Sequence, residues 1–189
     1  GNEAIIDIGH SRTLCSLSIE GKGAAFRQIN IGMSELIDAL VTSQDIDEPE
    51  AESLLWTTDI SLQSAGIEEL DFAPLYKSRD ELIQAIQTTL ILFEDSIELE
   101  IDRVRICGGG AQQKGMVKLL QEALGVPVEC IAPPMLLQSL DSPEAHALSF
   151  ALGEIATGMT NIRPIDLREG EFAFKGHLAN LGRIMKIGS

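Results

Sequence analysis

Two glycine-containing turns hold the residues of this sequence that are best suited to bind an anion. In the first, Asp7-Ile8-Gly9-His10-Ser11-Arg12-Thr13 supplies a carboxylate, a glycine and two hydroxyls at the end of an apolar run. In the second, Gly108-Gly109-Gly110 ends another apolar run. Glycine reaches positive φ without steric cost and leaves no Cβ between the backbone amides and a ligand. Each turn could therefore bring a phosphate group against the backbone.

The candidate binding residues are Asp7, Gly9, Ser11, Thr13, Gly108, Gly109 and Gly110. An explanation without a ligand is open for both turns. Short glycine-rich connections between a strand and a helix occur in many α/β proteins, and serine and threonine hydroxyls also stabilise turns by bonding to nearby backbone. The spacing alone does not decide between the two explanations. We assign no catalytic and no metal-ligating residue within the chain.

Three strands must position the first turn. The apolar run at residues 4–8 and the alternating run at 14–19 flank the turn, and Gly21-Lys22-Gly23 predicts a hairpin to a third strand at 24–31. Sequential strands with short links form an antiparallel meander. From about residue 33 to 76 the apolar spacing is helical, so we expect a small helical insertion there.

The second turn must lie between a strand and a helix. A capping box formed by Ser78 and Glu81 predicts the start of a long helix that leads to the strand before the glycines. The next helix is expected to begin near Gln112, with its unpaired N-terminal amides aimed at the turn. A fifth strand at residues 126–131 and a last helix from about residue 142 follow.

This order of elements predicts how the two turns meet. Right-handed crossovers place the strand before the glycine triplet parallel to the first strand and beside it. The turns that follow these strands then share one edge of a five-stranded mixed sheet with flanking helices. Open α/β sheets bind ligands where the connections change direction, so the topology predicts a binding site at this edge.

The composition limits the classes of function. With 14 basic and 29 acidic residues the chain has a net charge of −15, which argues against nucleic acid as a partner because phosphate neutralisation needs a basic surface. A basic protein partner fits this charge. Cys15, Cys107 and Cys130 are not at metal-ligand spacing, and we interpret them as reduced, buried thiols. No apolar run approaches the length of a membrane span.

These motifs resemble the actin-like ATPase superfamily, which has a ribonuclease H-like fold. Within it they resemble the branch that contains PilM of type IV pilus assembly and the L protein of type II secretion. Residues 7–13 are similar to the second phosphate loop, D-x-G-x-x-x-T, and residues 104–111 with 124–129 are similar to the adenosine motif and the strand beyond it. The stretch from 31 to 52 resembles PilM, and residues 165–173 resemble the tail of the L protein.

The resemblance implies that residues 1–160 form the second lobe of an actin-like domain, with the helical insertion at about 33–76, and that residues 161–189 form a tail leading toward a membrane-proximal segment. Our main hypothesis is a cytoplasmic scaffold of the inner-membrane platform of a type II secretion system, like the L protein. Such a scaffold is not an enzyme and has no cofactor in this chain. Its expected partners are the secretion or pilus ATPase and inner-membrane platform proteins.

The alternative hypothesis is a PilM-like ATP-binding protein of type IV pilus assembly, at most an actin-like ATPase. The resemblance then implies ATP with Mg²⁺ in the full-length protein. Asp7 would orient a magnesium-bound water, Thr13 would hold phosphate, and Gly109 and Gly110 would lie against the adenosine. A sugar kinase is a third hypothesis. In every case the other half of the cleft lies outside this chain, so the isolated chain is expected to bind ATP weakly and not to hydrolyse it.

The charge changes sign at the end of the chain. From Arg163 onward, five basic side chains and three acidic ones give a net charge of +2. Basic residues are retained beside membrane helices on the cytoplasmic side, although a C-terminus of chance composition would explain so small an excess. We expect the native protein to continue into one apolar span soon after Ser189, which would hold the domain at the cytoplasmic face of the bacterial inner membrane.

Overall fold

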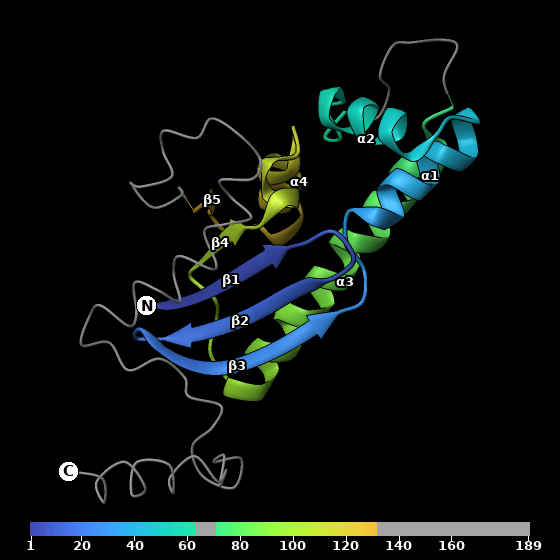
Figure 1. The fold of residues 1–189 in the computed structure, drawn as a ribbon. Coiled ribbons are helices and arrows are strands. Elements are labelled where there is room, and N and C mark those ends of the chain that lie inside the picture. The colour runs from blue at the N-terminus through green and yellow to red at the C-terminus, as the bar shows by residue number, and fades with distance from the viewer. Residues whose placement is uncertain (63–70, 132–189) are drawn as a thin grey trace, which may run out of the picture. The chain divides into compact units, whose positions relative to one another are not determined.

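A five-stranded mixed sheet forms the centre of the structure, a computed structural model that describes residues 1–62 and 71–131. β1 (Asn2–Ile8), β2 (Thr13–Ile19) and β3 (Lys22–Ile29) form an antiparallel meander. β4 (Arg103–Cys107) pairs in parallel with β1, and β5 (Val128–Cys130) pairs in parallel with β4. The strand order is β3-β2-β1-β4-β5 (Figure 1), which confirms the α/β fold and the sheet expected from the sequence.

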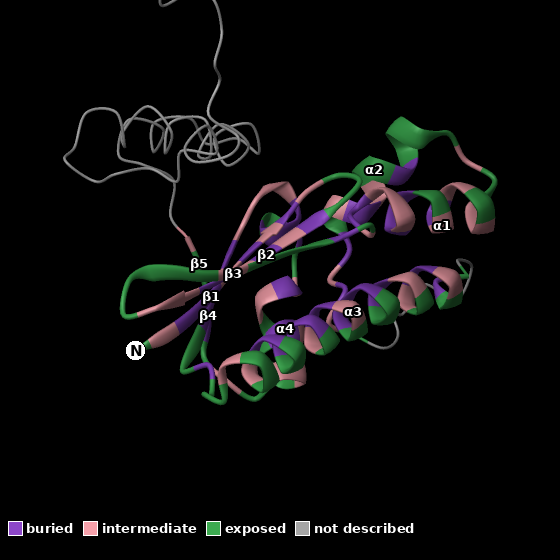
Figure 2. Cartoon of the chain, turned by 90° about the horizontal axis from the view of Figure 1, so that it is seen from below, coloured by how far each residue is buried: buried purple, intermediate pink, exposed green. Residues whose placement is uncertain are grey.

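Helices cover one face of this sheet. α3 (Ala73–Ile97) and α4 (Met116–Leu124) lie on that face, while α1 (Ser34–Gln44) and α2 (Glu48–Thr57) extend beyond the ends of the strands (Figures 1 and 2). α1 packs against both α2 and α3. The short 3-10 helix η1 (Gly109–Gln112) follows β4 directly. All the described residues belong to one unit, Gly1–Phe150.

The alternation of side chains in β1 decides which residues face the helices. Ala4, Ile6 and Ile8 are fully buried, as the period of two in a strand requires for residues on one face. A slip of one residue would exchange the two faces of the strand, so this apolar pattern fixes the register. Asp7 is therefore held on the opposite face of the sheet, at the end of the strand. α3 packs on β2 and β3, and its buried apolar side chains are Leu75, Leu82, Ile83, Ile86, Leu90 and Phe93.

The long helix α3 begins earlier than predicted. The capping box at Ser78 and Glu81 lies inside the helix, which starts at Ala73. The Asp71 carboxylate accepts a hydrogen bond from the amide of Ala73, and proline fits the first turn because its missing amide hydrogen is not needed there. The prediction was wrong because another start signal, at Asp71, stands about two turns upstream of Ser78.

Two more boundaries differ from the predictions. The hairpin between β2 and β3 turns at Glu20 and Gly21, both with positive φ, as a two-residue hairpin loop of type I′ requires. β3 therefore starts at Lys22 rather than at residue 24. After β4 and η1, α4 does not start near Gln112 but at Met116, because Gly115 adopts φ 91° and interrupts the helical path.

The cysteines are free, but they are not all buried as predicted. Cys15 is buried, Cys107 is half-buried and Cys130 is exposed. Cys130 belongs to β5, the strand at the edge of the sheet, where fewer elements cover it. The last helix predicted from about residue 142 and the tail at 161–189 lie outside the described residues. Within residues 1–62 and 71–131, no helix combines the length and the apolar character needed to cross a membrane.

Candidate functional site

The two glycine-containing turns lie side by side at one edge of the sheet. β1 and β4 run in parallel, and Asp7 pairs with Cys107 in their register. Each strand then enters its turn from the same edge, so Gly9 and Gly108 follow at neighbouring positions. A Cβ atom added to Gly108 would collide with the Asp7 Oδ1 atom and lie 2.6 Å from the carbonyl oxygen of Ile8. The predicted juxtaposition of the turns is confirmed.

Asp7 places a carboxylate at the meeting point of these turns. Burial raises its pKa above the ordinary value of 3.8, because a low-dielectric surrounding disfavours the charged form. Burial also raises the pKa of the neighbouring Cys107 thiol to about 12, with smaller contributions from the charges of Asp7 and Cys130. Cys107 is thus a protonated thiol at neutral pH. A cation bound next to Asp7 would stabilise the charged form of the Asp7 carboxylate.

The turn after β1 is tied to the start of α1. The Gly9 amide donates to the carbonyl of Arg12 at 3.0 Å, the Met33 amide donates to Gly9 at 3.1 Å, and the Ser34 amide donates to His10 at 2.7 Å. These bonds use carbonyl groups of the turn. The amides of His10 and Ser11 make no hydrogen bond to any described residue. They are therefore available to a negatively charged group.

Gly32 supports this turn, and our reading of the sequence did not assign it a role. A Cβ atom at Gly32 would collide with the His10 carbonyl oxygen and lie 2.7 Å from the Arg12 nitrogen. The signal in the sequence is a glycine directly after an apolar residue and before a helix. Because any side chain there would push the turn away from α1, Gly32 fixes the distance between them.

Thr13 points into the protein rather than into the turn. It is fully buried, and its hydroxyl donates to the carbonyl of Ile31 at 2.9 Å. His10, Ser11 and Arg12, by contrast, are exposed. The structure therefore brings Asp7, Gly9, Ser11 and the glycine triplet to one edge of the sheet. The Thr13 hydroxyl is buried and is occupied by its bond to Ile31.

The three glycines of the second turn have different surroundings. Gly108 adopts φ 83°, and a Cβ atom at Gly110 would collide with the Ile8 side chain and lie 2.8 Å from the Met33 sulfur. A Cβ atom at Gly109 would meet nothing within 4 Å. Gly108 and Gly110 are thus required by packing against β1. Gly109 leaves an accessible stretch of backbone that a ligand could approach.

Gln113 joins this turn to α2, which the sequence did not reveal. Its side chain is 2% exposed, and Nε2 donates to the carbonyls of Leu55 at 2.8 Å and Thr58 at 2.7 Å. Its Oε1 atom has no hydrogen-bond partner among the described residues. Beside it, a cleft of about 520 Å³ is lined by η1, α4 and Cys130. The helical insertion and the glycine turn are therefore mechanically connected next to an open cleft.

These residues can accommodate a phosphate-bearing ligand with a bound cation. The exposed amides of one turn, the accessible backbone at Gly109 and the half-buried carboxylate of Asp7 offer the complementary groups. The Thr13 hydroxyl does not contribute in this geometry. In residues 1–62 and 71–131, no cluster of three or more His, Cys, Asp or Glu side chains could hold a metal ion by itself.

Comparison with solved structures assigns the fold to the actin-like class. The chain is similar to MreB5 of Spiroplasma citri bound to AMPPNP, with 16% identity, a TM-score of 0.53 and coverage of 84% of this chain and 54% of that chain. It is also similar to apo psk41 ParM, with 18% identity, a TM-score of 0.51 and coverage of 84% and 42%. At these identities the likeness shows the fold alone.

The family model of the type IV pilus assembly protein PilM matches residues 2–158, so the chain belongs to the PilM family. A solved structure of a PilM-PilN type IV pilus biogenesis complex is similar as well, with 22% identity, a TM-score of 0.66 and coverage of 84% of this chain and 46% of that chain. The chain thus spans about half the length of this relative. Comparison with curated protein sequences gave no match. Of our two main hypotheses, the comparisons favour the PilM-like one over the L protein-like one.

Proposed function

We propose that this chain is the second lobe of a PilM-like protein that acts in type IV pilus assembly on the cytoplasmic face of the bacterial inner membrane. The observation that carries the proposal is the match to the PilM family over residues 2–158. The meander, the helical insertion and the two adjacent turns follow the order that the actin-like resemblance implies. The coverage of about half of the related PilM chain fits one lobe of two.

The proposed partner is a membrane-anchored platform protein of the PilN type. The relative with the TM-score of 0.66 was solved as a PilM-PilN complex, and a partner of this kind would hold the chain at the membrane. The pilus ATPase is a second proposed partner. A negatively charged protein with 29 acidic and 14 basic residues is suited to bind basic surfaces of either.

We further propose roles for the residues at the two turns in the full-length protein. Bound ATP would supply negatively charged phosphates and Mg²⁺ a cation, and both would favour closure of this lobe and the first lobe around the nucleotide. Asp7 would orient a magnesium-bound water, the amides of the turn from Gly9 would face phosphate, and Gly109 would lie against the adenosine. The Thr13 hydroxyl could bind phosphate only after its hydrogen bond to the Ile31 carbonyl is broken. We therefore propose that Thr13 stabilises the fold and does not bind phosphate.

A deletion experiment tests the proposed function and separates it from the L protein-like alternative. Removing the coding sequence from the source bacterium should abolish surface pili and leave secretion of type II substrates unchanged. The full-length protein should copurify with a PilN-type protein after membrane solubilisation. Loss of secretion with normal pili would contradict the proposal and support the scaffold of a secretion system.

A further inference from the structure

Large apolar side chains are exposed near the end of α3. Ile91, Leu92 and Leu99 expose 55%, 40% and 46% of their surface, and they are three of the five exposed large apolar residues in the described part of the chain. Ile91 lines a cavity between α3 and the end of α4, whereas Leu92 lines a separate hollow between α3 and β3. Leu99 follows just after the helix ends at Ile97. Single exposed apolar residues are normal on a protein surface, so the significance of Ile91 lies in the cavity that it borders.

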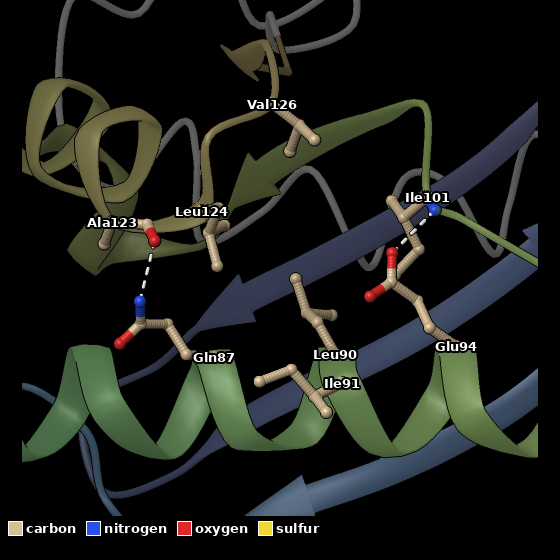
Figure 3. Close-up of a pocket in the computed structure, with 8 residues that line it drawn as sticks. All are labelled: Gln87, Leu90, Ile91, Glu94, Ile101, Ala123, Leu124 and Val126. Atoms are coloured by element: carbon tan, nitrogen blue, oxygen red, sulfur yellow. Dashed lines mark hydrogen bonds between the residues drawn. The ribbon is translucent and has the colours of Figure 1, made fainter.

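A cavity of about 110 Å³ opens beside Ile91 (Figure 3). α3 contributes Leu90 and Ile91 to its walls, and Leu124 and Val126 enter from the end of α4 and the link to β5. The walls are therefore mainly aliphatic. Because a cavity of about 150 Å³ takes up benzene, this one has room for a single aliphatic side chain.

The polar side chains at the cavity are already engaged with the backbone. Gln87 Nε2 donates to the carbonyl of Ala123 at 2.7 Å, and Glu94 Oε1 accepts from the amide of Ile101 at 2.8 Å (Figure 3). These two bonds connect α3 to the elements that follow it. They leave the aliphatic walls as the surface that an occupant would contact.

The surroundings of the cavity are strongly acidic. Residues 80–102 contain seven acidic side chains and no basic one. Five of them lie at or beyond the end of α3: Glu94, Asp95, Glu98, Glu100 and Asp102. None of these five forms an ion pair with a described residue. The last turn of α3 also carries no basic residue, although the negative end of a helix favours one.

We propose that the end of α3, together with this cavity, is a docking surface for a basic amphipathic helix of a partner protein. One aliphatic side chain of the partner fills the cavity, its neighbours cover Ile91, and its Lys and Arg residues face the acidic cluster. Amphipathic helices dock by their apolar face with anchors at i, i+3, i+4 and i+7. The missing positive charge at the end of α3 is thus supplied by the partner. This surface does not depend on nucleotide binding or on the function proposed above.

A synthetic peptide tests the surface directly. The probe is a fluorescent helix of about five turns with Leu at i, i+3, i+4 and i+7 and Lys elsewhere, titrated with the 189-residue chain and followed by anisotropy. The Lys peptide should bind, and its binding should weaken as salt is added. The same peptide with Glu in place of Lys should not bind.

Variants of the chain locate the binding. Ile91→Ser should weaken binding about tenfold, since it removes a buried aliphatic contact. Phe26→Ser on β3, where the side chain is 67% exposed, is the control and should leave the affinity unchanged. Ala123→Leu should also abolish binding because it fills the cavity from within. Added volume can also destabilise a protein, so the melting temperature of both variants is measured, and loss of binding by a variant that melts like the parent chain locates the site.

The charge contribution has a matched control. The triple variant Asp95→Asn, Glu98→Gln and Glu100→Gln should weaken binding and flatten its salt dependence. The triple variant Glu48→Gln, Glu50→Gln and Glu52→Gln changes the net charge equally on α2 and should have no such effect. Equal losses in the two triple variants would show attraction to the whole acidic chain and overturn the proposal. Unchanged binding of the Lys peptide to the Ile91→Ser variant would also overturn the proposal. Self-association of the chain that is lost in the Ile91→Ser variant would do the same, because the surface would then bind a second copy of the chain.

Discussion

Gly108 controls how closely the two turns of the candidate site approach each other. We expect Gly108→Ala to lower the free energy of unfolding by at least about 2 kcal/mol, because the residue has φ 83° and its new Cβ would collide with Asp7. Gly109→Ala is the matched control. A Cβ there meets nothing within 4 Å, so the change should stay within about 1 kcal/mol. Urea denaturation of both variants measures the difference, and equal losses would contradict the packing that we describe.

The charge of Asp7 lowers stability at neutral pH. Because burial raises its pKa above the ordinary 3.8, the folded state binds the proton more tightly than the unfolded state. The cost is absent below the unfolded pKa, and it grows as the pH rises to the folded pKa. We therefore expect Asp7→Asn to raise the melting temperature at neutral pH, with an advantage that vanishes below about pH 3.8.

Thermal denaturation across this pH range is the measurement. Asp38→Asn changes an exposed acid on α1 and should show no comparable trend. A less stable Asp7→Asn protein at neutral pH would mean that the carboxylate has an attractive partner in the folded chain. In that case Asp7 would belong to the structural framework of the sheet rather than to an open binding site.

At the scale of single residues, the sequence identified the kinds of groups at the site but not all their directions. Asp7 and Thr13 are equally plausible ligands by type and spacing. The strand pattern, however, separates them. Thr13 begins β2 on the buried side of the sheet, where its hydroxyl bonds to Ile31. The roles of Gly32 and Gln113 depend on contacts across 20 to more than 50 residues, which no local pattern records.

At the scale of elements, strong periodic patterns correctly predicted the sheet and the long helix. The predicted starts of β3, α3 and α4 were wrong because they were placed from local sequence signals. The topology followed from alternating strands, a long helical stripe and the handedness of crossovers. The start of α3 was misassigned because Ser78 and Asp71 both resemble caps. The late start of α4 at Met116 depends on the positive φ of Gly115. Only glycine fits there, because a Cβ atom at this position would lie 2.7 Å from the backbone nitrogen of Ser61.

The link between α2 and the glycine turn can be tested through Gln113. Gln113→Leu should lower the free energy of unfolding by about 1–3 kcal/mol, because the carbonyl of Thr58 loses its side-chain donor in a buried place and the carbonyl of Leu55 keeps only the Thr58 amide. Hydrogen exchange should accelerate in α2 more than in α3. Gln121→Leu, at an exposed position of α4, provides the control and should change neither quantity. Uniform acceleration across all the helices would contradict a specific link.

At the scale of the whole molecule, charge and size set what the chain can do by itself. Residues 28–76 contain eleven acidic side chains and no Lys, Arg or His, so most of the net charge of −15 belongs to the helical insertion and its flanks. Such a field repels a nucleotide unless cations and a second lobe offset it. The insertion is bonded to Gln113, which lines the open cleft, so its charge acts close to the candidate site.

The nucleotide hypothesis therefore makes a prediction about the isolated lobe. Titration calorimetry of the 189-residue chain with Mg²⁺ and ATP should show a dissociation constant weaker than about 1 mM, and phosphate release should not exceed the rate without protein. The isolated lobe supplies only half of the proposed cleft, and the exposed Arg12 is the only Lys or Arg side chain in the turn after β1. In the full-length protein, any ATP binding should be reduced by Gly109→Ala without a loss of stability, because its Cβ enters open space beside the turn. Micromolar binding by the isolated chain would show that this lobe is sufficient, and the two-lobed site that we propose would have to be abandoned.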